Sequence, residues 1–171
     1  MNILNGRTYW LNLTALLAVF GYLANFVTAE AQTTLSPTDH CQDFSSESIV
    51  TFADSDLAEV VHEALGLDAS VAVSCGQVAE LKELIVGTNI QRVVYGGTLR
   101  PSPQKPFESL DGIQNLTGLT RLNIINRLIT DIGPLSNLKN LISLNLHTNW
   151  FSDLSPIEGL TNLEQLITSE N

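Results

Sequence analysis

The residues between Phe107 and Asn171 repeat a pattern of leucine and isoleucine every 22 positions. Two full units read LTRLNIINRLITDIGPLSNLKN and LISLNLHTNWFSDLSPIEGLTN, and a third begins LEQLITSEN. With Leu119 and Leu141 as position one, positions one, four, six, eleven, fourteen, seventeen and twenty are apolar, Thr168 excepted. Such a period indicates a solenoid, in which each unit buries its apolar edge only against its neighbours.

The first seven positions of each unit alternate between apolar and polar residues, as in a strand with one buried face. In the second unit, Leu144 and Leu146 are predicted to point into the core, whereas Ser143, Asn145 and His147 point outward. The pattern therefore predicts an α/β solenoid of the leucine-rich repeat class, with short parallel strands.

The chain is predicted to turn after each strand. Asn149 and Asn171 occupy position nine, where a short amide side chain can bond backbone groups that a tight bend leaves without partners. Arg127 holds that position in the first full unit and cannot accept such bonds, so we expect it to point outward or to mark the junction with the preceding segment. Proline in both return limbs favours 3₁₀ or extended backbone over an α-helix.

Two amphipathic helices are predicted ahead of the repeats. Residues 52–67 carry an apolar stripe at helical spacing, and residues 73–87 begin with Ser74 and Gln77 in the arrangement of a capping box. We expect these helices to cover the open edge of a first strand at residues 90–95.

The repeats and the helical segment together resemble the internalin type of bacterial leucine-rich repeat protein. The resemblance is carried by FADSDLAEVVHEALGL at 52–67, VSCGQVAELKELIVG at 73–87 and SLDGIQNLTGLTRLNI at 109–124, within a match from Ile49 to Asn171. The chain departs from the family pattern at Arg127 and in about seven extra residues after the first strand. The resemblance implies recognition of a protein or surface ligand, without catalysis and without a cofactor.

The amino-terminal residues are typical of a secretory signal peptide. Arg7 precedes an apolar run over 11–26, and small residues before Ala29 and Ala31 suit cleavage. The alternative is an uncleaved membrane anchor, although polar residues interrupt the run and no stop-transfer charges follow. We therefore divide the chain into a signal peptide (1–29), a polar linker (30–48), a helical cap (49–89) and a leucine-rich repeat domain (90–171), and we expect a secreted, periplasmic or cell-surface protein.

The mature chain is predicted to be acidic. Removal of residues 1–29 takes Arg7 and leaves seven basic against 18 acidic residues, a formal charge of −11. Such a surface repels phosphate backbones and anionic lipid, so nucleic acid is a poor partner and a basic surface is a plausible one. Cleavage of the signal peptide would leave no stable membrane span. The charge also keeps a secreted protein soluble.

The chain has two cysteines, Cys41 and Cys75, on either side of the first predicted helix. In an oxidising compartment they favour one disulfide, which closes a loop of 33 residues. A zinc site built from His40, Cys41, His62 and Cys75 is the alternative, but the spacing fits no usual zinc motif.

Sequence motifs of catalysis are missing: there is no G-x-S-x-G, no H-E-x-x-H and no glycine-rich phosphate loop. Asp131 and Asp153 recur once per unit, so we expect them to bond backbone amides in the return limb and not to form an acid/base pair.

The outward strand positions are the predicted partner-binding surface. Trp150 is included in this predicted surface because position ten, beside Asn149, is expected to face solvent at the rim. There it either contacts a partner or packs on Leu128 of the preceding coil. The proline-containing loop 96–106 is a second candidate, or a tolerated insertion. The predicted partner-binding residues are Arg121, Asn123, Ile125, Ser143, Asn145, His147, Trp150, Gln165 and Ile167.

The sequence therefore predicts a non-catalytic recognition module that is secreted or attached to the cell surface. Two alternatives stay open. The chain is a structural envelope protein that self-associates through its open carboxy-terminal repeat, or it is a fragment of a larger protein with a downstream catalytic domain.

Overall fold

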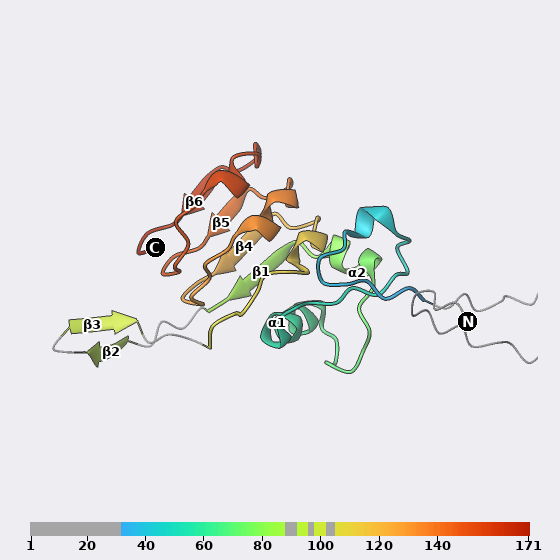
Figure 1. Ribbon diagram of the computed structural model, residues 1–171, viewed down its shortest axis with the longest axis horizontal. Coiled ribbons are helices and arrows are strands. Elements are labelled where there is room, and N and C mark those ends of the chain that lie inside the picture. Colours follow the sequence, from blue (N-terminus) through green and yellow to red (C-terminus); the bar gives the residue numbers. More distant parts are fainter. Residues whose placement is uncertain (1–31, 88–91, 96–97, 102–104) are drawn as a thin grey trace, which may run out of the picture. The chain divides into compact units, whose positions relative to one another are not determined.

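The computed structural model describes residues 32–171 apart from 88–91, 96–97 and 102–104 (Figure 1). The predicted signal peptide over 1–29 lies outside the described residues. Residues 31–171 make up a unit separate from residues 1–30, and all that follows concerns that unit.

Four short strands form a parallel sheet, which Figure 1 shows as a stack in chain order. They are β1 (Glu83–Val86), β4 (Arg121–Ile124), β5 (Ser143–Asn145) and β6 (Gln165–Ile167). Leu84, Leu122, Leu144 and Leu166 lie directly opposite one another across the sheet. This register confirms the predicted leucine-rich solenoid and its common leucine spine.

The return limbs contain 3₁₀ helices that stack on one another opposite the strands. They are η2 (Ile113–Asn115), η3 (Gly133–Asn137) and η4 (Ser155–Ile157). Proline stands in the first turn of η3 and η4, as the sequence indicates, because its fixed φ suits that position and its missing N–H is not needed there. The core fills the space between the two stacks and includes the fully buried Leu119, Leu122, Leu135, Leu138, Leu141 and Leu144.

The turn after each strand needs left-handed backbone at position eight. Asn126, Thr148 and Glu170 occupy this position in successive coils, with φ of 56°, 57° and 60°. Non-glycine residues rarely adopt this conformation, and asparagine does so most readily. The sharp bend leaves neighbouring backbone N–H and C=O groups without hydrogen-bond partners in the turn itself. A side chain must therefore provide those hydrogen bonds.

Asn149, at position nine, supplies those partners. Its side chain is completely buried. Its carbonyl oxygen accepts from the amides of Arg127 and Ile129 at 3.1 and 3.2 Å, and its amide nitrogen donates to the carbonyls of Ile124 and Leu146 at 2.8 and 2.9 Å. The bonds join two coils, because Ile124, Arg127 and Ile129 precede Asn149 by roughly one repeat. The predicted role of this asparagine is confirmed.

Arg127 lies where the first coil meets the preceding segment, one of the two positions expected for it. Its guanidinium carbon lies 5.0 Å from the centre of the Phe107 ring, and the guanidinium donates to the Lys105 carbonyl at 3.0 Å. Partial burial lowers the pKa of Arg127, and Asp56 and Asp54 oppose that shift.

The helical cap consists of α1 (Ser55–Leu65) and α2 (Cys75–Glu80). Helix α1 ends at Gly66, whose φ of 68° is the left-handed conformation that glycine adopts without strain. Helix α2 begins with the predicted capping box of Ser74 and Gln77. Helix α1 contacts β1, and α2 contacts η2, so the cap covers the first coil.

The second cap helix is shorter than the sequence indicates. The predicted helix over 73–87 ends at Glu80, and the first strand of the sheet is β1, not residues 90–95. Leu81, Leu84 and Val86 fit positions one, four and six of the repeat, so β1 pairs with β4 and buries Leu84 and Val86. Pairing and burial here outweigh the local preference for helix.

Residues beyond β1 form an insertion larger than the seven residues expected. Glu83 and Arg121 are opposite each other although they are 38 positions apart, whereas Arg121 and Ser143 are one repeat of 22 apart. The extra 16 residues contain β2 (Arg92–Tyr95) and β3 (Thr98–Pro101). These two strands pair antiparallel with each other and are not part of the parallel sheet.

Residues 32–48 are ordered on the cap and are not the free linker that their polar composition indicates. They contain the 3₁₀ helix η1 (Cys41–Asp43). Leu35 is buried and its amide donates to the Ile49 carbonyl at 2.8 Å. Cys41 forms a disulfide with Cys75, as predicted, and its amide donates to the Asn115 side chain at 2.7 Å. In the chain-entropy model a loop of this length contributes about 3 to 4 kcal/mol to stability.

Asp54 joins the cap to the first coil, which yields a test of the cap assignment. One carboxylate oxygen accepts from the amides of Asp56 and Leu57 at 2.8 and 2.9 Å, and the other accepts from the Glu108 amide at 2.6 Å. We expect Asp54→Ala to lower the free energy of unfolding by about 2–4 kcal/mol in urea denaturation, because it removes an N-cap and a charge-assisted bond to a distant segment.

The control is Glu59→Ala, which removes an exposed carboxylate from the same helix. This variant should stay within about 0.5 kcal/mol of the wild type. Equal losses in the two variants would show that Asp54 does not join these segments.

Candidate recognition surface

The outward positions of the parallel strands form three rows across the sheet. Residues of one row lie on adjacent strands, about 5 Å from one another, so their side chains make one continuous surface, here called the strand face. Its rows are Glu83, Arg121, Ser143 and Gln165; Ile85, Asn123, Asn145 and Ile167; and Gly87, Ile125, His147 and Ser169. The structure thus brings together every predicted partner-binding residue except Trp150.

Four members of the strand face are absent from the sequence-based set: Glu83, Ile85, Gly87 and Ser169. Glu83 and Ile85 were missed because β1 was predicted to be the end of a helix. The signal that could have found them is the apolar spacing of Leu81, Leu84 and Val86, which matches the repeat frame although 16 inserted residues separate it from the next unit.

Side chains of the first and third rows are linked between neighbouring coils. Arg121 donates to Glu83 at 2.8 Å in an exposed ion pair. Ser143 donates to Gln165 at 3.3 Å, and Nδ1 of His147 lies 2.8 Å from the Ser169 hydroxyl. The ion pair balances the charges of the first row, so the strand face carries little net charge although the chain is acidic.

Exposed isoleucines flank the two asparagines of the middle row. Ile85 is 44% exposed and Ile167 is 48% exposed, at opposite ends of the row, and Asn123 and Asn145 are half-buried between them. Ile125, in the third row, is only partly exposed. Because the sheet already fixes the backbone of these isoleucines, covering them with a partner costs side-chain entropy but little backbone entropy, which favours binding.

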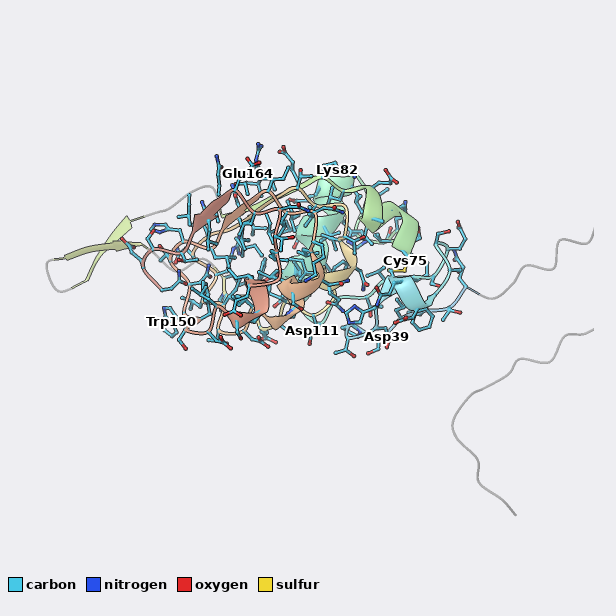
Figure 2. The ribbon with its side chains drawn as sticks, turned by 90° about the horizontal axis from the view of Figure 1, so that it is seen from above. Asp39, Cys75, Lys82, Asp111, Trp150 and Glu164 are labelled. Atoms are coloured by element: carbon cyan, nitrogen blue, oxygen red, sulfur yellow. A yellow bond between two sulfur atoms is a disulfide. The ribbon has the colours of Figure 1, made fainter. Side chains whose placement is uncertain are left out.

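Trp150 projects from the rim just beyond β5, and Figure 2 shows it at the periphery of the unit. It is 67% exposed, the largest exposure among the big apolar side chains that the structure describes. Its backbone amide donates to the Ile129 carbonyl at 2.8 Å, which fixes the backbone while leaving the indole in solvent. Packing between coils therefore accounts for little of the Trp150 surface.

The two cysteines are used by their disulfide, so the alternative zinc site is contradicted for Cys41 and Cys75. His62 is held within the cap instead: its Nδ1 lies 2.7 Å from the Ala58 carbonyl and its Nε2 lies 2.9 Å from the Val71 carbonyl. Within the described part of the chain, no group of three or more histidine, cysteine, aspartate or glutamate side chains is placed to hold a metal ion.

Asp131 and Asp153 have the structural role that the sequence indicates. Asp131 accepts from the Gly133 amide at 2.7 Å, and Asp153 accepts from the Ser155 amide at 2.8 Å. Ser109 does the same one repeat earlier, where its hydroxyl accepts from the Asp111 amide at 2.9 Å. Each bond closes the turn ahead of a 3₁₀ helix, so the aspartates belong to the repeat framework.

The second sequence candidate, the loop over 96–106, falls partly outside the described residues. Its described portion includes β3 and Lys105. Lys105 donates to Asp56 at 2.6 Å, and this bond raises the pKa of Lys105. The Lys105 charge is therefore paired with Asp56 of the cap.

None of the helices among the described residues has the length and apolar character needed to cross a bilayer.

Comparison with known proteins supports the repeat architecture. The family described as "Leucine Rich repeats (2 copies)" matches residues 117–159. The solved structure of internalin InlF from Listeria monocytogenes is 32% identical, covering 70% of this chain and 31% of that one, with a TM-score of 0.57. Internalin C2 from the same bacterium is 20% identical over 72% of this chain and 60% of that one, with a TM-score of 0.44.

A structure of the CBM51-2 and INT domains of Clostridium perfringens ZmpB is also similar, with 21% identity over 59% of this chain and 18% of that one and a TM-score of 0.44. The chain thus spans less than a third of the InlF structure and 60% of the internalin C2 structure. No curated protein matches the chain.

The hydrogen bonds from Ser155 to Asp153 can be checked by titrating the Asp153 carboxyl group. Hydrogen bonds from the Ser155 amide and hydroxyl lower the pKa of Asp153 from its ordinary value of 3.8. A lowered folded-state pKa stabilises the fold above the unfolded value, and that contribution is lost as the pH falls through the folded pKa. We expect carboxyl chemical shifts to titrate below 3.8 in the wild type, and Ser155→Ala to raise the midpoint.

Ser152→Ala, which removes an exposed neighbouring hydroxyl, should leave the midpoint unchanged. A midpoint of 3.8 or higher in the wild type would contradict the proposed bonding of Asp153.

Proposed function

The chain is a leucine-rich repeat protein of the internalin type, and from that premise we propose that it is a secreted or cell-surface recognition module. The module binds a protein partner on the strand face and Trp150, and it carries out no catalysis. The observation that carries this proposal is the surface of the sheet itself: isoleucines 44% and 48% exposed beside amides, on a sheet whose opposite side buries Leu84, Leu122 and Leu144.

Leucine-rich repeats bind protein ligands, and the chemistry of the strand face fits such a ligand. Interface hot spots combine aromatic and aliphatic anchors with surrounding polar groups that exclude water. Trp150, Ile85 and Ile167 provide such anchors, while Asn123 and Asn145 provide hydrogen-bonding groups. The core leucines and Asn149 hold the strands in place, so binding requires little ordering of the surface.

A location outside the cytosol is supported by the disulfide of Cys41 and Cys75, because such bonds persist in oxidising compartments. The signal peptide predicted for residues 1–29 points the same way. The absence of catalysis is supported by the repeat-framework roles of Asp131 and Asp153, whose oxygens are bonded to backbone amides.

A second candidate function is self-association through β6. Leu166 is in register with the buried Leu144 but is 45% exposed, as no further strand among the described residues covers it. A second molecule could pair along this edge and cover the leucine.

The strand-face proposal is tested with a surface panel. We expect Trp150→Ala, Ile85→Asp and Ile167→Asp each to weaken binding of the labelled protein to its target surface by about tenfold or more, since each removes a hot-spot anchor. The Tm should change by no more than about 2 °C, because the three side chains are exposed. Binding is measured by titrating the labelled protein onto cells to which the wild type binds. The Tm is measured by calorimetry.

Val71→Asp and Leu154→Asp are the matched controls, since these side chains are 42% and 43% exposed but lie away from the strand face. They should bind like the wild type. Equal losses in the controls, or a large fall in Tm for Trp150→Ala, would argue against the strand face. Concentration-dependent sedimentation of the wild type that Leu166→Asp abolishes would favour the second candidate.

A further inference from the structure

A furrow of about 510 Å³ follows one edge of the strand face. Its side chains stand at position two of successive coils, immediately before the outward residues of the first row. They are Lys82, Thr120, Ile142 and Glu164, and the neighbouring Asn140 and Asn162 also line it. Figure 2 shows Lys82 and Glu164 along the same side of the unit, away from Trp150, Asp111 and Asp39.

The furrow carries opposite charges at its two ends. Lys82 and Glu164 are both exposed, and within the described residues neither forms an ion pair. The described ion pairs that involve lysine or arginine are Lys105 with Asp56 and Arg121 with Glu83. The two free charges therefore remain available to a ligand, and together they define a direction along the solenoid.

An exposed isoleucine separates the charged ends. Ile142 is 42% exposed and lies one strand from Glu164 and two strands from Lys82. Its neighbour in the row, Thr120, is half-buried and donates its hydroxyl to the Lys82 carbonyl at 3.1 Å. The middle of the furrow is thus apolar and has a fixed floor, which suits a short aliphatic side chain of a ligand.

Two asparagines along the furrow are held in defined orientations. Asn140 donates from its amide nitrogen to the Thr117 carbonyl at 2.8 Å, and Asn162 donates to the Lys139 carbonyl at 2.9 Å. Each bond reaches back one coil. Among the described residues, no group donates to the side-chain carbonyl oxygens of Asn140 and Asn162. Acceptors fixed in advance bind peptide N–H groups at low entropic cost.

The spacing of the two charged groups matches an extended peptide, whose middle side chain then lies between Thr120 and Ile142. Lys82 and Glu164 are three strands apart, which is about 14 Å at the usual spacing between strands. An extended chain rises about 3.4 Å per residue, so residues i and i+4 lie about 14 Å apart and point to the same side as residue i+2.

We propose that the furrow binds an extended peptide segment of a protein partner, with an acidic side chain on Lys82, an aliphatic side chain two residues away against Ile142, and a basic side chain two residues further on Glu164. This site goes beyond the strand face but rests on the proposed function of protein recognition. Peptides with the same charge at both ends meet repulsion at one end of the furrow, so the charges select sequence as well as attract it.

The probes are three terminally blocked peptides with the sequences Glu-Ser-Leu-Ser-Lys, Glu-Ser-Leu-Ser-Glu and Lys-Ser-Leu-Ser-Lys. Each is titrated at low salt into ¹⁵N-labelled protein, and amide shifts report both the site and the Kd. The first peptide should perturb the amides of Thr120 and Ile142 and bind about three- to tenfold more tightly than either of the others. Ile142→Ser should weaken it, and high salt should reduce the preference.

Charge-exchange variants make the test specific. Lys82→Glu should shift the preference to the peptide with two lysines, and Glu164→Lys to the peptide with two glutamates. The double variant restores one charge of each sign, so it should again prefer the mixed peptide, bound in the opposite chain direction. All three substituted residues, Lys82, Ile142 and Glu164, are at exposed positions, and the ¹⁵N spectrum confirms that each variant is folded.

Binding without any charge preference, a preference that the exchange does not move, or shifts confined to other parts of the protein would overturn the furrow proposal. The same holds if no peptide binds. Those results leave the strand face untouched, because its own test uses Trp150, Ile85 and Ile167 and none of the furrow residues. Target binding that stays unchanged in all three variants of that panel, with peptide selection intact, would instead sink the proposed function of the strand face.

Discussion

The side chain of Asn149 is the constraint on which the rest of this structure depends. A coil of 22 residues has to reverse direction at the end of a very short strand, and the bend turns backbone amides and carbonyls toward the core. One buried amide group satisfies four of them, and three of these belong to the preceding coil. Asn171 repeats the arrangement, since it accepts from the Asn149 amide and donates to Leu146. Burial of the leucines drives the stacking of coils, but apolar contacts do not depend on direction. The hydrogen bonds of Asn149 do, so they fix how one coil is oriented against the next.

This division of labour leaves the outer surface free for recognition. Stability resides in the inward leucines, in position nine and in the turn-closing Asp131 and Asp153, none of which faces a partner. Outward positions can therefore carry exposed isoleucine, tryptophan or unpaired charge with little effect on the fold. The strand face and the furrow lie side by side on the same rigid strands, so a partner that engages both would meet one preformed surface with an apolar part and a charged, directional part.

The repeat frame was predictable because every coil solves the same packing problem with the same residue types. Leucine spacing indicated the strands, position nine indicated the turn, and the capping box indicated the start of α2. Prediction failed where the chain departs from the period. Six residues of helix lead directly into β1, and local preference cannot show that Leu84 pairs with Leu122 across an insertion of 16 residues. The polar residues 32–48 look like a linker, yet a disulfide holds them to the cap, and the side chains of Asn115 and Gln114 hold them to η2. The wrong helix assignment left Glu83, Ile85 and Gly87 out of the predicted site.

Native-state hydrogen exchange on Asn149→Leu is the sharpest test of whether the Asn149 amide group holds the coils together. The leucine side chain has the same branched shape and the same number of heavy atoms as that of asparagine, so the substitution removes hydrogen bonds more than packing. If Asn149 joins the coils, the amides of Arg127 and Ile129 exchange slowly in the wild type and at least about a hundredfold faster in the variant. The free energy of unfolding should also fall by at least about 3 kcal/mol. The Ala58 amide, bonded within the cap to the Asp54 carbonyl, should follow only the global change. Slow exchange at Arg127 and Ile129 in a variant as stable as the wild type would show that the Asn149 side chain does not hold the coils together.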